Sequence, residues 1–337
     1  MRFIGVDLHS NQITLCYLTK QGNEKLASFA LNKLEEFLKT LKRTDRLAVE
    51  ATGNTRWFVG QVKERVEQVV VVNPNQFDVI RKSVKKTDRH DARALAQFLS
   101  KEMLPEARMK SEQASEINSL ATTRDKLVKL RTTLVNKLHA LSRGRGVASR
   151  KSQFLSKKGL RAVLEQEWSA TARVEIEVIV TQINSLNEGI KRLDEQLCVS
   201  GEEVSGQKNL VSIKGIGPRA AAILLAVIGE VADFESEEKL ASYFGIVPRV
   251  ANSNERVQHG RITKRGSKLG RTTLVQCTLV AKKYSPYLKA FYERIKGRKG
   301  GGKAIIATAR KFLGIIYRTL KNNWVFEDFP NFVLAEG

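Results

Sequence analysis

The chain has 337 residues, a formal net charge of +23 and a pI of about 10.0. This length allows two or three domains with real cores, and a charge this positive indicates a polyanionic partner such as nucleic acid. The start lacks a signal-peptide pattern and no apolar run reaches the length of a membrane span, so we expect a cytoplasmic protein with no membrane partner. The scattered Cys16, Cys198 and Cys277 predict reduced thiols rather than a zinc site.

Residues 1–108 have the pattern of an α/β domain. Apolar runs at residues 3–8, 13–18 and 25–31 predict an antiparallel meander. A helix capped by Asn32 should follow, then a strand at 47–50, a helix from about 54 to 66 and a strand at 68–72. Another helix begins after Thr87, which is a suitable N-cap. This order of elements resembles that of the ribonuclease-H-like folds.

Four acids stand at strand ends or at a helix start in this domain. Asp7 ends the first strand and Glu50 the fourth, while Asp88 and Asp91 share one face of a helix because they are three residues apart. Each acid alone is explained as a capping or solvated residue. Because sites in open α/β sheets form at the carboxyl ends of strands, however, we expect the four to converge. Such a set would bind Mg²⁺ or Mn²⁺ and could clamp a phosphodiester.

Two histidines lie beside these acids in the sequence. His9 follows Asp7 by two residues, and His90 lies between Asp88 and Asp91. Neither occupies a position that the metal chemistry requires. We therefore interpret both as bystanders.

Residues 109–205 predict two long helices. Leucines at 127, 130, 134, 138 and 141 form one helical stripe, and apolar residues from 172 to 197 alternate in spacings of four and three. The helices could fold on each other as a hairpin or pair between chains. The strict heptad spacing favours a coiled coil that forms a dimer. Arg124 and Arg131 fall at the edge of the first stripe and weaken a purely apolar seam.

Residues 206–325 predict a mainly helical C-terminal domain. Gly215 and Gly217 separate two helices and Pro218 starts the second, which resembles a helix-hairpin-helix that binds phosphate; an ordinary helix corner explains the pattern equally well. Residues 249–322 contain 19 Lys and Arg but only 2 Asp and Glu, which favours phosphate contact. We expect a polar loop at 250–256 and a flexible basic linker at 296–303. The expected nucleic-acid-binding residues are Lys214, Gly215, Gly217, Arg249, Arg256, Arg261, Lys264, Arg265, Lys268, Arg271, Arg298, Lys299 and Lys303.

Eight short motifs carry a resemblance to a known family. They are GVDL (5–8), VEATG (49–53), VNP (72–74), KTDRHDA (86–92), IKGIG (213–217), FGIVPR (244–249), GRITKRG (260–266) and ARKFL (309–313). In this order they resemble the DEDD transposase family of bacterial insertion sequences, from residue 1 to about 325. The resemblance implies a RuvC-like domain at 1–108, a coiled-coil region at 109–205 and a transposase domain at 206–325.

The resemblance also implies a mechanism and partners. Family members include recombinases in which a noncoding bridge RNA pairs with donor and target DNA. Strand exchange there uses a serine nucleophile together with the four acids and Mg²⁺, in dimers that pair into tetramers. Asp7, Glu50, Asp88 and Asp91 match the acidic set, and Ser253 is the only serine in the expected loop. The loop lacks the serine- and glycine-rich character usual in the family. We expect a nucleoid-associated bacterial protein.

Three other functions fit parts of the sequence. A RuvC-like metal-dependent endonuclease, acting on junctions or duplexes, would need the four acids but not Ser253. An actin-like sugar kinase or ATPase could use GVDL and a following hairpin to hold phosphate, but the chain has no second glycine-rich adenosine-binding motif. A non-catalytic nucleic-acid scaffold would need none of the acids. The recombinase accounts for both the acids and the basic C-terminal block.

Overall fold

The structure, a computed structural model, describes residues 1–337 except 75, 78–86, 254–255 and 336–337, and excludes the side chains of 250–259. It divides into two units, Met1–Met109 and Lys110–Gly337. The predicted boundary after residue 108 lies beside this division, whereas the predicted boundary after residue 205 falls inside the second unit. None of the described helices has both the length and the apolar character needed to cross a membrane.

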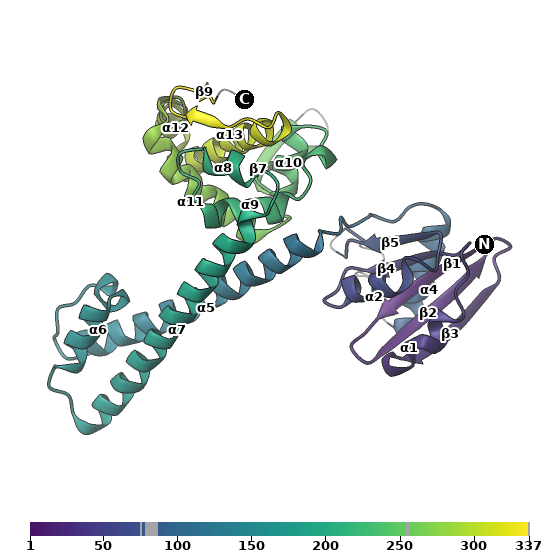
Figure 1. The fold of residues 1–337 in the computed structure, drawn as a ribbon, viewed down its shortest axis with the longest axis horizontal. Coiled ribbons are helices and arrows are strands. Elements are labelled where there is room, and N and C mark those ends of the chain that lie inside the picture. The colour runs from purple at the N-terminus through teal and green to yellow at the C-terminus, as the bar shows by residue number, and fades with distance from the viewer. Residues whose placement is uncertain (75, 78–86, 254–255, 336–337) are drawn as a thin grey trace. The chain divides into compact units, whose positions relative to one another are not determined.

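The first unit is built on a five-stranded sheet in the order β3-β2-β1-β4-β5 (Figure 1). Strand β1 pairs antiparallel with β2 and parallel with β4, so it is the central strand. The elements are β1 Arg2–Leu8, β2 Gln12–Thr19, β3 Glu24–Ala30, η1 Leu31–Lys33, α1 Leu34–Leu38, β4 Arg46–Glu50, α2 Thr55–Val62, β5 Gln68–Val72 and α4 Asp88–Ser100. This confirms the predicted mixed sheet and the order of its elements.

One detail of the prediction is wrong. The helix expected to begin at an Asn32 cap is preceded by the 3-10 turn η1, and Lys33 occupies its N-cap position without a side-chain hydrogen bond. The turn η1 begins at Leu31, immediately after β3 ends at Ala30. Leu31 N donates to Asn11 O at 2.8 Å, which holds the start of the turn against the chain before β2. Asn32 therefore lies inside the turn rather than in front of a helix.

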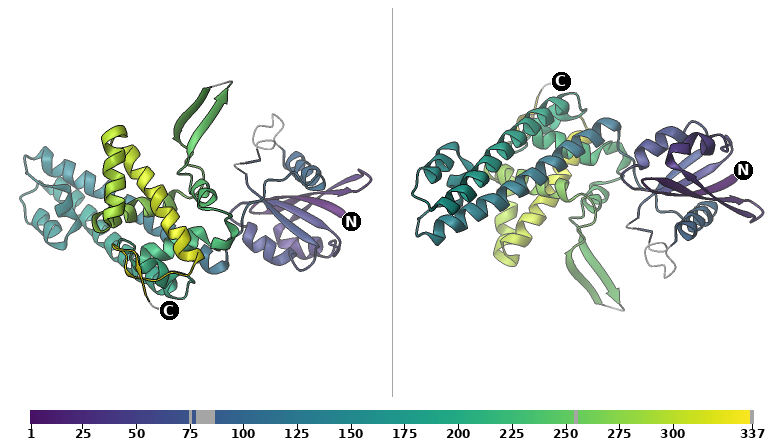
Figure 2. Two further views of the ribbon diagram at one scale, coloured as in Figure 1. Left: turned by 90° about the horizontal axis from the view of Figure 1, so that it is seen from above. Right: turned by 90° about the horizontal axis from the view of Figure 1, so that it is seen from below.

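Helices cover both faces of this sheet (Figure 2). Side chains alternate between the faces of a strand, so each strand serves two cores. Helices α1 and α2 pack on one face, where Phe37 and Phe58 are fully buried with Val6 and Val49. Helix α4 packs on the other face, against side chains that include Phe3, Cys16, Ala48 and Val70.

The second unit begins with a long antiparallel pair of helices, α5 Glu112–Gly144 and α7 Ala170–Glu202. Polar side chains connect the two helices, and the residue numbers rise along α5 as those of their partners fall along α7. Arg124 donates to Asp194 at 2.7 and 3.2 Å, and Arg131 donates to Asn187 at 2.8 Å. The arginines that weakened the predicted seam thus bind the partner helix of the same chain. Of the two arrangements that the sequence allowed, this structure has the hairpin within one chain.

The remaining elements of the second unit form a helical body with one long β-hairpin. They are η2 Lys151–Leu155, α6 Lys157–Leu164, α8 Gln207–Val211, α9 Pro218–Ile228, η3 Val231–Asp233, α10 Glu237–Tyr243, β6 Pro248–Ser253, β7 Arg256–Ile262, α11 Lys268–Tyr284, α12 Pro286–Lys299, α13 Gly301–Lys321, β8 Phe326–Asp328 and β9 Val333–Leu334. Helices α8 to α13 enclose a core that includes Phe244 and Phe312, both fully buried. The predicted, mainly helical character of this region is confirmed.

The flexible basic linker predicted at residues 296–303 is wrong, because almost all of it is helical. Helix α12 continues to Lys299, Gly300 turns the chain with a φ of +77°, and α13 begins at Gly301. Packing overrides the low helix propensity of the glycines, since Leu288 of α12 and Ala304 of α13 are fully buried. Arg298, Lys299 and Lys303 are therefore exposed on helices.

Candidate metal and nucleic-acid sites

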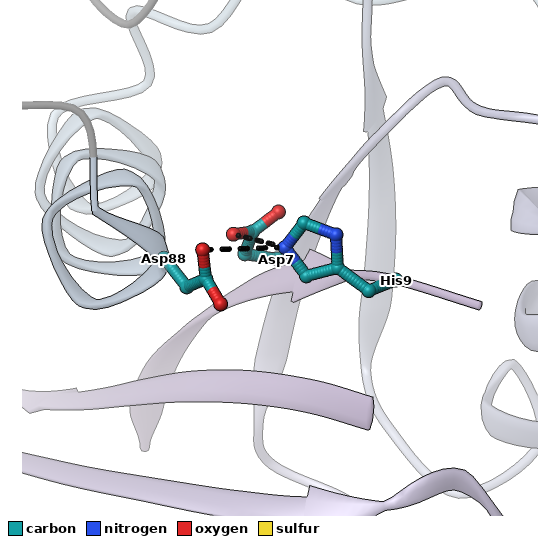
Figure 3. Close-up of side chains that lie close together, drawn as sticks. All are labelled: Asp7, His9 and Asp88. Atoms are coloured by element: carbon teal, nitrogen blue, oxygen red, sulfur yellow. Dashed lines mark hydrogen bonds and ion pairs between the residues drawn. The ribbon is translucent and has the colours of Figure 1, made fainter. Parts of the chain in front are cut away.

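Asp7, His9 and Asp88 form a compact polar group at the end of the central strand. Nε2 of His9 lies 3.1 Å from Oδ2 of Asp7 and 3.4 Å from Oδ1 of Asp88 (Figure 3). One ligand atom from each residue lies within 4.8 Å of the others. Asp7 is 15% exposed, whereas His9 and Asp88 are each 44% exposed. Asp7 is therefore the partly buried member of the group, and solvent reaches the group through His9 and Asp88.

Two local features place Asp88 at this position. Thr87 is extended and its hydroxyl accepts from His90 N at 3.3 Å, so the predicted N-cap is confirmed and α4 begins at Asp88. Gly5 then lets the helix lie directly on β1, because an added Cβ would stand 1.9 Å from Ala92 O and 2.5 Å from Ala96 N. The close approach of the helix and strand brings the first turn of α4 to the end of β1.

Glu50 and Asp91 lie near this group without belonging to it in the described structure. Val6 pairs with Val49 in parallel register, so Asp7 and Glu50 are the next residues of adjacent strands. Phe3 and Ala48 face α4, and strand alternation puts Asp7 and Glu50 on the same side. Asp91 lies one helical turn beyond Asp88 and interacts with Asp7 through its charge.

The loops that follow β1 and β4 are tied together beside the site. Asn54 Nδ2 donates to His9 O at 3.0 Å, and Thr55 Oγ1 donates to Glu50 O at 2.6 Å. Gln12 Nε2 donates to Asp88 Oδ2 at 3.2 Å. The first two bonds hold the backbone after β1 and β4, and the third orients the carboxylate of Asp88.

The electrostatics of the group favour a bound cation. Burial raises the pKa of Asp7, the nearby His9 opposes this, and the charges of Asp88 and Asp91 raise the pKa further, so the net direction is upward. Burial lowers the pKa of His9, but the two aspartates outweigh it and raise that pKa above its ordinary value. Carboxylates that are partly desolvated beside one another fit a divalent ion, which would offset their repulsion. Oxygen donors suit Mg²⁺ or Mn²⁺, and the imidazole is also compatible with Mn²⁺.

The ring of His9 bridges the two aspartates, which its interpretation as a bystander did not anticipate; whether it takes part in the chemistry stays a prediction. The sequence did contain a signal. His9 follows Asp7 by two residues just past a strand end, and residues two apart in extended chain point to the same side. His90 does not belong to the three-residue group that the structure describes. Lys86, which begins the KTDRHDA motif, lies outside the described residues.

The predicted turn between two helices is present around Gly215 and Gly217. Helix α8 ends at Val211, and α9 begins at Pro218 with Gly217 as N-cap. Gly215 has a φ of +113°, and an added Cβ would stand 2.6 Å from Ala281 N, so packing against α11 requires this glycine. An added Cβ on Gly217 meets nothing within 4 Å, and Lys214 is exposed. The start of α9 is thus open to a ligand at Gly217.

The polar loop predicted at residues 250–256 is wrong, because β6 and β7 form a hairpin there. Ser253 is the last residue of β6 and pairs with Arg256 of β7. Residues such as Val250, Val257 and Ile262 favour strands, and the two runs are close in sequence. The side chains of Ser253 and Arg256 lie outside the described part of the structure.

The base of this hairpin is held by tight backbone contacts. Gly245 has a φ of +66°, and an added Cβ would stand 1.9 Å from Arg265 O. Nη1 of Arg271 donates to three carbonyl oxygens, those of Phe244 at 3.2 Å, Arg265 at 3.4 Å and Gly266 at 3.1 Å. Arg271, a predicted phosphate contact, therefore holds the hairpin base. The other described basic residues of this segment are exposed, namely Arg249, Arg261, Lys264, Arg265 and Lys268.

Two family models match the chain. A DEDD transposase model of IS110 elements, described as "Transposase", matches residues 4–144. A second model, described as the transposase IS116/IS110/IS902 family, matches residues 207–293. The first match contains the acid cluster and the second contains the turn at Gly217 and the hairpin.

Similarity to individual proteins extends over both units. The chain is 25% identical to the transposase for insertion sequence element IS1111A of Coxiella burnetii, over 95% of this chain and 90% of the relative. It is 27% identical to the transposase for insertion sequence element IS1328 of Yersinia enterocolitica, over 82% of this chain and 83% of the relative. It is also 27% identical to the pilin gene-inverting protein of Moraxella lacunata, over 96% and 97% respectively.

Proposed function

Because the chain belongs to the IS110/IS116 family of insertion-sequence transposases, enzymes that cleave and recombine DNA, we propose that it moves its element by divalent-ion-dependent strand cleavage and exchange. The observation that carries the proposal is the group of Asp7, His9 and Asp88 at the end of β1. The domain that bears it would be RuvC-like. Similarity to a pilin gene-inverting protein supports recombination rather than simple hydrolysis.

In this proposal the four acids hold the metal and His9 orders them. Asp7, Glu50, Asp88 and Asp91 would be the ligands, and Mg²⁺ or Mn²⁺ would supply positive charge to the phosphodiester oxygens during displacement. His9 keeps the carboxylates of Asp7 and Asp88 together when no cation is bound. Its raised pKa supports the protonated form, which neutralises part of their charge.

We propose that Ser253 is the nucleophile for strand exchange. Its Oγ would form a bond to phosphorus of the DNA backbone while a phosphorus–oxygen bond to deoxyribose breaks, and the released sugar oxygen takes a proton. The location of Ser253 at the end of β6, where it pairs with Arg256 of β7, supports this role. Cationic side chains offset charge that develops on a phosphate in the transition state.

Ser253→Ala is expected to abolish the covalent protein–DNA adduct and to reduce strand exchange by at least about 10³-fold, since no other oxygen replaces the nucleophile. Denaturing gels of the protein with labelled element-end DNA would detect the adduct. Ser242→Ala, an exposed serine on α10, is the matched control. An adduct in the Ser253→Ala protein would contradict the assignment. Cleavage without any adduct in the unmodified protein would favour the alternative, a RuvC-like junction or duplex endonuclease.

The nucleic-acid partners in this proposal are donor DNA, target DNA and a noncoding guide RNA. The exposed basic residues on the hairpin, on the turn before α9 and on α12 and α13 support extensive phosphate contact. The protein would act as dimers that pair into a tetramer, with the guide RNA selecting both DNA sites.

Expression with the native flanking DNA is expected to yield a discrete flank-encoded RNA bound to the purified protein. RNA sequencing of the purified complex measures this directly. The matched control is the same protein expressed without its flanking DNA. Random cellular RNA in both preparations would count against RNA guidance and would leave the metal-dependent cleavage as a separate question.

A further inference from the structure

The α5–α7 hairpin ends in a small folded region, residues 143–169, which we call the cap. It contains η2 and α6 and lies at the end of the hairpin away from α9 to α13 (Figure 1). Phe154, Leu160 and Val163 of the cap are almost fully buried against α5 and α7. The cap is therefore a packed structure with its own hydrophobic contacts.

The surface of the cap is strongly basic. Residues 143–169 contain seven basic residues and two acids, Glu165 and Glu167. All seven are exposed: Arg143, Arg145, Arg150, Lys151, Lys157, Lys158 and Arg161. Within the described residues only Arg161 forms an ion pair, with Glu165 at 3.9 Å. Most of this charge is thus available to an external anion.

Hydrogen bonds hold the basic segments in place. His139 Nε2 lies 3.0 Å from Ser149 O, and Arg145 Nη2 donates to Ser169 Oγ at 3.0 Å. Ser156 caps α6 by accepting from Gly159 N at 3.1 Å. Lys157 and Lys158 then fall in the first turn of α6, where positive charge opposes the helix dipole. A phosphate beside this turn would be attracted by both the lysines and the dipole.

We propose that the cap binds the backbone of duplex DNA, at a surface separate from the basic residues of 214–303. Single strands are held mainly by stacking on exposed aromatic rings, but Phe154 is 1% exposed and Trp168 lies under Arg145 at 5.7 Å. The cap therefore offers charge without a stacking platform, which suits a duplex. Arg124 of α5 and Arg219 of α9 both bind Asp194, so Arg124 marks where α9 packs on the hairpin. The cap begins about 28 Å along α5 from Arg124, the length of about eight base pairs. The proposal rests on the chain acting on DNA but not on its cleavage chemistry.

The test compares two full-length variants with equal loss of charge. The cap variant combines Arg143→Gln, Lys151→Gln, Lys157→Gln and Lys158→Gln. The control combines Lys33→Gln, Lys63→Gln, Lys191→Gln and Lys239→Gln, whose ammonium groups already face acids in the folded protein. Fluorescence anisotropy with a random-sequence duplex, several helical turns long, gives Kd over a range of salt. The slope of log Kd against log salt is expected to fall by about 3 to 4 in the cap variant, because about 0.9 counterions are released per phosphate. The control slope should stay close to that of the unmodified protein.

Three results would overturn the proposal. In the first, the cap variant keeps the salt slope of the unmodified protein. In the second, the control loses as much slope as the cap variant, which would show that total charge and not the cap determines the salt dependence. A matched RNA duplex could bind more tightly than DNA through the same residues, which would assign the cap to RNA. Failure of the proposed function remains distinguishable. If the unmodified protein does not cleave DNA, the difference in slope still supports the cap; if it cleaves DNA and the slopes agree, only the cap proposal fails.

Discussion

The Asp7→Asn protein is expected to keep its fold and to lose metal-dependent DNA cleavage by at least about 10³-fold, or about 4 kcal/mol of transition-state stabilisation. The substitution removes one carboxylate charge from the Asp7, His9 and Asp88 group while it preserves the size of the side chain. Excision of the element from a plasmid in the presence of Mg²⁺ measures the effect. Asp125→Asn is the matched control, because Asp125 is a partly exposed acid on α5 that pairs with Lys129.

The same variant has an expected effect on stability that a merely structural aspartate would not give. The raised pKa of Asp7 means that the folded state binds the proton more tightly, so the free energy of unfolding falls as pH rises from about 3.9 through the folded pKa. At neutral pH Asp7→Asn removes this penalty, and the metal-free variant should have a higher Tm. Mg²⁺ should raise the Tm of the unmodified protein more than that of the variant. Normal cleavage, or a lower metal-free Tm, would contradict the role assigned to Asp7.

Gly5→Ala is expected to destabilise the first unit by about 2 to 3 kcal/mol and to reduce cleavage by about 10²-fold or more. The added methyl group would overlap Ala92 O, so α4 must move away from β1 and carry Asp88 with it. Thermal unfolding and the plasmid assay measure the two effects.

The control for this prediction is Gly60→Ala on α2. An added Cβ there meets nothing within 4 Å, and alanine favours a helix over glycine by about 1 kcal/mol, so its stability should be equal or higher. If both variants unfolded at the same temperature, the close contact at Gly5 would not contribute to the stability of the first unit. If Gly5→Ala destabilised the unit without loss of cleavage, α4 would not be what positions Asp88.

Local patterns were sufficient to predict the strands of the first unit and the order of its elements. The strands follow from short apolar runs, and Thr87 is a helix cap whose function depends only on its neighbours. Asp7 and Glu50 could be located because both are the polar residues that follow buried runs. The contact of His9 with Asp88 was missed because Asp88 is distant in sequence and its position is set by contact between α4 and β1.

The second unit shows where composition misleads. Gly300 and its basic neighbours have the composition of a linker, yet buried Leu288 and Ala304 anchor helices on both sides. The basic and polar residues of β6 and β7 were interpreted as a loop, but they form a hairpin whose strands are stabilised by pairing with each other. Arg271 looked like its neighbouring arginines, but only its surroundings show that it binds three carbonyls. Charge counts alone cannot separate such a structural arginine from one that faces a ligand.

The crossing of α4 over β1 also has a consequence for synthesis of the protein. The hydrogen bond from Gln12 to Asp88 joins residues 76 positions apart, and α4 ends only at Ser100. Contacts of such high sequence separation form late, and a nascent chain cannot make them until the distal segment has left the ribosome. A transposase chain that terminates before residue 87 would contain Asp7 and Glu50 without Asp88 or Asp91. On the proposed mechanism such fragments would lack two of the four metal ligands and would not cleave DNA, so cleavage would require a completed first unit.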